Sequence, residues 1–191
     1  MITEASADQQ PILVTKRLVL RRWQQRDLAP FAALNADPDV MRYFLAPLDR
    51  AASDSFVDRI ETRFAEHGYG LWAVELRGDG QFIGFIGLAR HTFPAHFNPA
   101  VEVGWRLARS AWGHGYATEG ARAALDYAFG PAQLSEVVSM TAVLNEPSQA
   151  VMRRLGMTRE PADDFDYPSI PSGHPLRPHV LYRLSRETWL G

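Results

Sequence analysis

The most informative stretch of the sequence runs from Val101 to Thr118 and reads VEVGWRLARSAWGHGYAT. A strand leads directly into a turn, and the turn opens a helix. Gly113 and Gly115 occupy the turn, where glycine permits a positive φ and a close approach of a ligand to the backbone. Free N–H groups and the macrodipole at a helix start form an anion site. The pattern therefore indicates either a phosphate-binding loop or an ordinary strand-to-helix turn.

The spacing of this turn differs from that of a dinucleotide-binding loop. The Gly-x-Gly-x-x-Gly fingerprint needs a glycine where this chain has Thr118, and no acidic residue follows on a second parallel strand in the expected context. A Walker-type phosphate loop needs a well-placed lysine, and the single lysine of the chain is Lys16. The turn is therefore compatible with a pyrophosphate-containing ligand but not with an NAD site.

The rest of the chain predicts further strands and helices around this stretch. Strands are indicated by alternation or β-branched residues, and helices by apolar spacing with capping residues, Pro near the start or Gly at the end. We predict strands at 13–23, 71–76, 82–88, 101–107, 137–143 and 180–184, with a hairpin turn at 77–80. One helix is predicted to start at Asp27 and a second at Ser53 or Asp54. Two more helices are predicted at 117–129 and 146–155. Strands that feed one crossover helix and return predict an α/β fold with a mixed sheet and helices on both faces.

Composition excludes several classes of protein. The 191 residues carry a formal net charge of −2, so the chain lacks the basic footprint of a nucleic-acid binder. It has no cysteine, which removes disulfides, zinc–thiolate sites and a cysteine nucleophile. No run approaches the 18 apolar residues of a membrane span, and residues 1–10 lack the pattern of a secretory signal. We expect one cytoplasmic domain over residues 1–191, with no metal and no nucleic-acid or membrane partner.

Three motifs follow one another in the chain: Glu102-Val-Gly-Trp105, then Trp112-Gly-His-Gly-Tyr-Ala-Thr-Glu119, then Asn145-Glu-Pro-Ser148 with Arg154-Leu-Gly-Met157. Their combination resembles the GNAT superfamily of N-acetyltransferases, and most of all its RimJ/RimL-like branch of ribosomal-protein N-alpha-acetyltransferases. The resemblance extends from Thr15 to the last strand. It implies the GNAT fold, with a strongly twisted mixed sheet of about six to seven strands, and acetyl-CoA as the co-substrate.

The resemblance also implies which residues hold acetyl-CoA. The pyrophosphate is expected on the glycine loop and the pantetheine arm along the strand before it. The implied donor-binding residues are Trp105, Leu107, Trp112, Gly113, His114, Gly115, Tyr116, Ala117, Thr118, Asn145 and Arg153. This sequence departs from the family pattern at Ser110, where Gln or Arg is usual, and at His114, where the usual residue is basic. Arg109 or Arg153 is then expected to supply the missing charge.

Acetyl transfer needs a neutral amine, although most amines are cationic at pH 7. Glu102 is the expected base, acting through a water; the alternative is a carboxylate that faces solvent or pairs with an arginine. Ser148 is expected to hydrogen-bond the departing sulfur, and its alternative role is to satisfy free N–H groups at a helix start. Asn145 is expected to bind pantetheine, with a turn or cap as the alternative. Because cysteine is absent, we expect direct attack in a ternary complex, with a serine nucleophile as the alternative.

Residues outside the motifs give further expectations. Trp72 lies on a predicted strand and is expected mostly in the core. The family resemblance implies an acceptor pocket near Tyr43 and Phe44, with Trp72 as a further candidate. His91 and His96 flank a Phe-Pro pair without a carboxylate between them, which favours a solvated loop over a metal site. The acidic cluster formed by Asp163, Asp164 and Asp166 is either a solvated loop or a group of charges that attracts a cationic acceptor.

We therefore expect an N-acetyltransferase that moves an acetyl group from acetyl-CoA to a primary amine of a small molecule, peptide or protein N-terminus. The alternative from another class is a non-catalytic acyl-CoA-binding sensor, which would not need both Glu102 and Ser148. The loops at 38–55 and 91–100 have no readable code for the acceptor. The segment after Pro161 packs either on its own domain or on a partner subunit, so a homodimer stays open as an alternative to a monomer.

Overall fold

The computed structural model describes residues 12–191, so the prediction about residues 1–10 lies outside the described part of the chain. The strands are β1 (Leu13–Val14), β2 (Leu18–Arg21), β3 (Leu71–Leu76), β4 (Phe82–His91), β5 (Ala100–Leu107), β6 (Glu136–Ala142), β7 (Thr158–Arg159), β8 (Phe165–Asp166) and β9 (Pro178–Ser185). The α-helices are α1 (Leu28–Ala36), α2 (Pro38–Met41), α3 (Arg50–His67), α4 (Tyr116–Phe129), α5 (Glu146–Arg154) and α6 (Arg186–Leu190).

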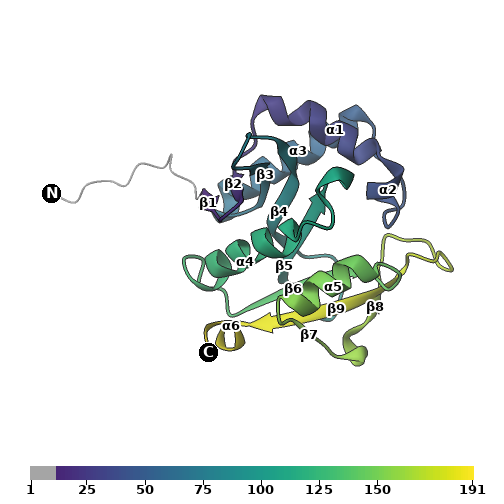
Figure 1. The fold of residues 1–191 in the computed structure, drawn as a ribbon. Helices are drawn as coiled ribbons and strands as arrows, with labels where there is room; N and C mark the ends of the chain where they lie inside the picture. Colours follow the sequence, from purple (N-terminus) through teal and green to yellow (C-terminus); the bar gives the residue numbers. More distant parts are fainter. Residues whose placement is uncertain (1–11) are drawn as a thin grey trace.

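The strands form one mixed sheet with helices on both faces (Figure 1). Their order is β1-β2-β3-β4-β5-β6-β9-β7, and β8 also pairs with β9. All neighbours are antiparallel except β5 and β6. This arrangement confirms the predicted α/β class and mixed sheet. The described residues form nine strands rather than six or seven, because three two-residue strands give too little pattern to be recognised.

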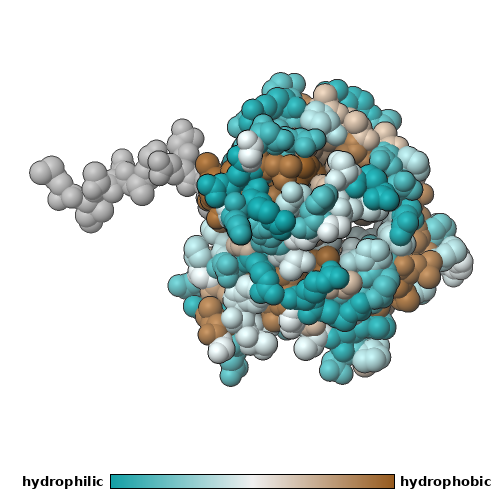
Figure 2. Space-filling model, in the orientation of Figure 1, coloured by the Kyte–Doolittle hydropathy of each residue, from teal (hydrophilic) through white to brown (hydrophobic). Residues whose placement is uncertain are grey.

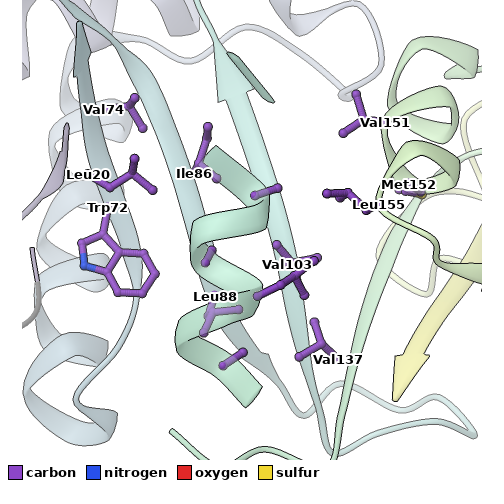
Figure 3. Close-up of a cluster of buried hydrophobic side chains, with 14 of the residues drawn as sticks. Leu20, Trp72, Val74, Ile86, Leu88, Val103, Val137, Val151, Met152 and Leu155 are labelled. Atoms are coloured by element: carbon purple, nitrogen blue, oxygen red, sulfur yellow. The ribbon is translucent and has the colours of Figure 1, made fainter. Parts of the chain in front are cut away.

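The centre of the sheet is apolar on both faces. Ile86, Leu88 and Val103 are buried in the cluster that also receives side chains of α4 and α5 (Figure 3). Phe85 lies in a second cluster with Phe31 of α1 and other residues from α1 to α3. Helix α4 packs closely on the strands, since a Cβ at its Gly120 would lie 2.4 Å from Cδ1 of Ile86. The helix that follows the glycine loop is therefore held firmly on the sheet.

Strands β5 and β6 form a fork rather than a continuous ladder. They pair in parallel at Glu102 and Val138, and no register pair joins them beyond this point. Ser139 is the next residue of β6, and its Oγ donates a hydrogen bond to the Val103 carbonyl at 2.9 Å. The backbone of residues 104–107 consequently has no strand partner on the side of β6. This opening between the two strands connects the faces of the sheet.

The N-terminal predictions need two corrections. The strand predicted at 13–23 is split into β1 and β2 by a tight turn, in which the backbone N–H of Thr15 donates to Leu18 and the Leu18 N–H donates to Thr15 Oγ1. Asp27 stands at the N-cap position of α1, as predicted, but its side chain makes no capping hydrogen bond there. Its buried carboxylate binds the guanidinium of Arg21 at 2.7 Å and 2.9 Å and accepts a hydrogen bond from the Gln24 N–H at 2.8 Å, so its oxygens are used on the side away from α1.

The helical region that follows also differs from its prediction. The apolar spacing from Phe31 and Leu34 extends the predicted first helix to Val40, but Val40 belongs to the separate helix α2, because Asp37 ends α1 and accepts a hydrogen bond from the Asp39 N–H. Helix α3 begins at Arg50 under the cap of Asp49 rather than at residue 53. Ser53 is buried inside α3 and accepts a hydrogen bond from Asn35 of α1, a contact that local sequence does not reveal.

The segment after Pro161 packs on its own domain. Ile170 and Leu176 form a small buried cluster with Ala142 at the end of β6, and Tyr43 and Tyr167 pack against it. The loop between β8 and β9 lies beside α2 in the ribbon (Figure 1). This loop therefore covers the end of β6 that lies near α2. None of the helices within residues 12–191 is long and apolar enough to cross a membrane.

Candidate active site

A cavity of about 1280 Å³ passes through the fork between β5 and β6. The molecular surface is hollowed between the half that holds α1 to α3 and the half that holds α5 and β9 (Figure 2). The structure brings nearly all the predicted site residues together in the wall of this cavity: Glu102, Trp105, Leu107, Trp112, Gly113, His114, Gly115, Tyr116, Ala117, Thr118, Asn145 and Ser148.

The glycine loop has the backbone geometry of an anion site. Gly113 and Gly115 have φ angles of 79° and 78°, which residues with a Cβ rarely adopt. Gly115 is the N-cap of α4 and supplies no side chain, so the first N–H groups of the 14-residue helix have no capping oxygen. The ring of His114 stacks on Tyr116 beside them. These free N–H groups and the helix dipole can bind a pyrophosphate.

The arginines near this loop and the cavity are not the ones that the sequence predicts. Arg153 does not line the cavity, because its guanidinium pairs with Glu146 on the same helix. Arg154 lines the cavity instead. Arg17, which sequence reasoning missed, lies against the loop: a Cβ at Gly115 would be 3.6 Å from its Nη2. Arg17 comes from the turn before β2, about a hundred residues away, so no local signal reveals it.

Glu102 lies where the fork between β5 and β6 begins. Its carboxylate lines the cavity and is 17% exposed. Oε2 lies 2.7 Å from Nε2 of His91, and Oε1 accepts a hydrogen bond from the Met140 N–H at 3.3 Å. The partner of Glu102 is thus a histidine, rather than solvent or an arginine. These contacts hold the carboxylate toward the opening in the sheet.

The expectation of a solvated loop at His91 is wrong. His91 ends β4, which is three residues longer than predicted, and its side chain is 25% exposed. Ala89 lies opposite Glu102 in the β4–β5 hairpin, so His91 is the diagonal neighbour on the same face. Sequence reasoning missed the pair because the apolar run ends at Leu88. Extending the hairpin register by three residues would have found it.

The surroundings of His91 favour its cationic form. Burial lowers the pKa of His91, but the hydrogen bond and the negative charge of Glu102 raise it by more, so the pKa lies above its ordinary value. Nearby His179, which also lines the cavity, has a pKa lowered by burial. The surroundings of these two histidines, which lie in the cavity wall together with His114, therefore shift their pKa values in opposite directions.

Asn145 has the capping role that was its alternative, whereas Ser148 does not have the capping role that was considered for it. Asn145 caps α5, since its Oδ1 accepts a hydrogen bond from the Ser148 N–H at 3.3 Å and its Nδ2 donates to Thr141 at 2.8 Å. The hydroxyl of Ser148 makes no hydrogen bond within residues 12–191, so helix capping does not use it. Both side chains line the cavity. Ser148 is thus free to donate a hydrogen bond into the cavity.

The expected acceptor pocket is present in part. Tyr43 and Phe44 line the cavity near α2. Trp72 does not line it, because the side chain is fully buried and packs edge-on against Phe64 and Tyr127. The core role predicted for Trp72 is therefore confirmed and the pocket role is not, because its position on β3 turns the ring into the core beside α4.

The acidic segment does not present free negative charge to the cavity. Asp163 Oδ2 lies 2.6 Å from Nε of Arg183, and Oδ1 lies 3.1 Å from His96. The hydrogen bond from Arg183, helped by His96 and opposed by burial, holds the pKa of Asp163 below its ordinary value. The other two carboxylates form the pairs Asp164–Arg159 and Asp166–Arg177. None of the three aspartates lines the cavity.

The family follows from a match that spans most of the chain. Residues 17–158 match the family model described as acetyltransferase (GNAT) domain. The chain belongs to the GNAT acetyltransferase family. The predicted superfamily and fold are thereby confirmed, and this GNAT acetyltransferase is an enzyme of the N-acetyltransferase type.

Individual relatives agree with this assignment. The GNAT acetyltransferase is 34% identical over 146 residues to the uncharacterized protein YkkB of Bacillus subtilis, which covers 76% of this chain and 84% of YkkB. It is 31% identical over 192 residues to FsC-acetyl coenzyme A-N(2)-transacetylase of Aspergillus fumigatus, covering 95% of this chain and 79% of that protein. The crystal structure of a GNAT-family acetyltransferase from Bacillus anthracis superposes with a TM-score of 0.76 at 25% identity, covering 93% and 99% of the two chains.

The residues of this GNAT acetyltransferase fit acetyl-CoA, the donor of the family. The uncapped N–H groups at the start of α4 suit the pyrophosphate. The free backbone of residues 104–107 in the fork offers amide partners for the pantetheine arm. Glu102 and Ser148 lie in the same cavity.

Proposed function

We propose that this chain acetylates a primary amine by direct attack of the amine on the thioester of acetyl-CoA in a ternary complex. The observation that carries the proposal is the position of Glu102, a half-buried carboxylate held by His91 at the start of the fork. One cavity reaches both this carboxylate and the glycine loop. A base and a donor site that share one cavity can act together without an acyl-enzyme.

Each side chain has a defined part in the reaction. Glu102 takes a proton from the incoming ammonium, through a water, and leaves a neutral amine. The amine nitrogen forms a bond to the thioester carbon while the carbon–sulfur bond breaks, and the sulfur leaves as a thiolate. The unused hydroxyl of Ser148 donates a hydrogen bond to that sulfur. The acetylated nitrogen then passes its remaining extra proton to the thiolate, and Glu102 releases the proton that it took up to the solvent.

The finer assignment within the family is part of the proposal. The motifs of the chain favour the RimJ/RimL-like branch. The fungal relative is named for transfer from acetyl coenzyme A to an N(2) position, which supports a nitrogen acceptor for this chain as well. The alternative of a non-catalytic acyl-CoA sensor is disfavoured, because a sensor has no need of a positioned carboxylate and a free hydroxyl in one cavity.

The experiment that tests the proposal measures thiol release from acetyl-CoA with a panel of primary amines. The protein contains no cysteine, so a thiol reagent detects only free coenzyme A. We expect release with at least one amine, and its loss in the Glu102→Gln variant at unchanged affinity for acetyl-CoA. Binding of acetyl-CoA without release for any amine would support the sensor, and equal rates in the variant would exclude Glu102 as the base.

A further inference from the structure

The wall of the cavity that faces α2 and α3 carries an excess of positive charge. The cavity is lined by six arginines and by a single carboxylate, that of Glu102. One of the six arginines, Arg154, follows the Ser148 motif and lies on the side of the cavity that we expect to bind acetyl-CoA. The five on the acceptor side are Arg42, Arg59, Arg63, Arg90 and Arg106. Within residues 12–191, none of these five forms an ion pair with a carboxylate.

Arg106 is the most unusual of the five. Its Nη1 donates a hydrogen bond to Oδ1 of Asn35 at 2.6 Å, and Phe44 covers the guanidinium at 4.2 Å from its ring centre. Its Nε is buried and has no hydrogen-bond partner. Burial lowers the pKa of Arg106 to about 10, so the guanidinium still carries its charge at neutral pH. A buried N–H of a cation without an acceptor is unfavourable, so the group lacks a partner that a ligand can supply.

The partner that fits this guanidinium is a carboxylate. Nη1 is used by Asn35, whereas the edge formed by Nε and Nη2 meets no acceptor within residues 12–191. That edge presents two parallel N–H donors, the arrangement that binds both oxygens of a carboxylate. The ring of Phe44 is 42% exposed on the loop after α2, so it is the group that an incoming carboxylate would displace.

Arg106 and Glu102 lie on the same face of β5, four residues apart, with Gly104 between them. Alternation along a strand places their Cα atoms about 13 Å apart on one face. Gly104 has no side chain, and a Cβ at this position would meet only Glu102, at 3.9 Å. The floor between the proton acceptor and the cation is therefore open. A molecule with an amine at one end and an anion at the other end matches these two groups.

We propose that Arg106 binds a carboxylate of the acceptor, so that the acceptor is an amine that also carries a carboxylate. The inference rests on the proposed acetyl transfer and names its substrate class. Polyamines are poor acceptors in this arrangement, because a second cationic centre would approach arginines that have no carboxylate partner within residues 12–191.

The test compares ω-amino acids of increasing chain length, from glycine to 6-aminohexanoate, with their amides and with spermidine, by thiol release. We expect at least one amino acid to exceed its amide about tenfold in kcat/KM, mainly through KM, with spermidine below both. Arg106→Gln should bring the ratio of acid to amide close to one, and Arg106→Lys should restore part of it. Arg186→Gln is the matched control, because Arg186 does not line the cavity.

Two results would overturn the inference while the proposed acetyl transfer stands. The first is a preference for the amides or for spermidine, and the second is a preference for acids that survives in Arg106→Gln. If no amine of any kind gives thiol release, the acetyl transfer itself is refuted, and the subsite with it. The thermal unfolding midpoint and the acetyl-CoA affinity of each variant show that a changed ratio does not come from misfolding.

Discussion

Nε2 of His91 lies 2.7 Å from Oε2 of Glu102, across the β4–β5 hairpin. This contact joins a histidine that no motif contains to the carboxylate that we propose as the base. It fixes the direction of the carboxylate and raises the pKa of His91. The predictions below follow from this pair, from the glycine loop and from the cap of α5.

Glu102→Ala should lower kcat by roughly 10²- to 10⁴-fold at neutral pH, the usual range for removal of a general base. The loss should shrink as the pH rises, because free amine then becomes abundant without a base. Steady-state rates between pH 7 and pH 10 check this prediction, with acetyl-CoA affinity as the control. A loss that is equal at every pH would argue against a base role.

The pair of His91 and Glu102 should make stability depend on pH. The pKa of His91 is raised in the folded protein, so its contribution is complete below the unfolded pKa of about 6.5 and is lost as the pH rises through the folded pKa. The free energy of unfolding should therefore differ more between wild type and His91→Gln at pH 6 than at pH 9. The same comparison in a Glu102→Gln background should show no such trend; a trend that persists there would mean that another group is responsible.

Ser148→Ala should reduce kcat by roughly 10- to 1000-fold, as expected for a lost hydrogen bond to the leaving group. It should leave stability nearly unchanged, because the Ser148 hydroxyl does not cap α5. Asn145→Ala is the contrasting variant and should cost about 1 kcal/mol of unfolding free energy, since it removes the observed cap. A decrease in kcat of less than threefold for Ser148→Ala would remove the serine from the proposed mechanism.

Gly115→Ala should weaken acetyl-CoA binding. The positive φ of this residue makes a side chain unfavourable by roughly 1–2 kcal/mol, and the strain would shift the N–H groups that we expect to bind the pyrophosphate. Gly80→Ala is a matched control, because Gly80 has a φ of 72° in the turn between β3 and β4, and a Cβ there meets nothing within 4 Å. Both variants should lose similar stability, measured by denaturant unfolding, and only Gly115→Ala should lose affinity. Equal affinities would mean that the loop does not hold the donor.

Neutralising the acidic segment should leave the acceptor KM unchanged, even at low salt. The carboxylates of Asp163, Asp164 and Asp166 are paired with arginines and do not line the cavity. Kinetics of the triple Asp→Asn variant at low and moderate ionic strength test this prediction. A higher KM at low salt alone would restore the idea that these charges attract a cationic acceptor.

Local patterns in the sequence were sufficient for most of the fold. The strand, glycine turn and helix at residues 101–129 are adjacent in the chain, so their torsion preferences and apolar spacing describe them together. The predicted helix boundaries were less accurate where a side chain of the capping type makes a tertiary contact instead. Asp27 resembles a cap by type, yet its carboxylate binds Arg21, and Ser53 resembles a helix start but is buried under Asn35.

The candidate site was likewise predicted from the sequence in part. The donor loop and the residues Glu102, Asn145 and Ser148 were predicted from motifs, and all of them line one cavity. Arg153 was predicted with them and lies outside it, because its position on α5 directs it toward Glu146. Arg17 could not be predicted to lie at the loop, because its contact with Gly115 joins segments about a hundred residues apart.

The sequence by itself determined the order of the elements, the glycine loop and the family resemblance, because backbone torsions and side-chain periodicity act over a few neighbouring residues. Tertiary structure alone decided which charges meet and which stay unpaired. His91 with Glu102, and Arg106 without a carboxylate, result from strand pairing and helix packing. Electrostatic energies and desolvation depend on distance through space, and the chain has to fold before those distances exist.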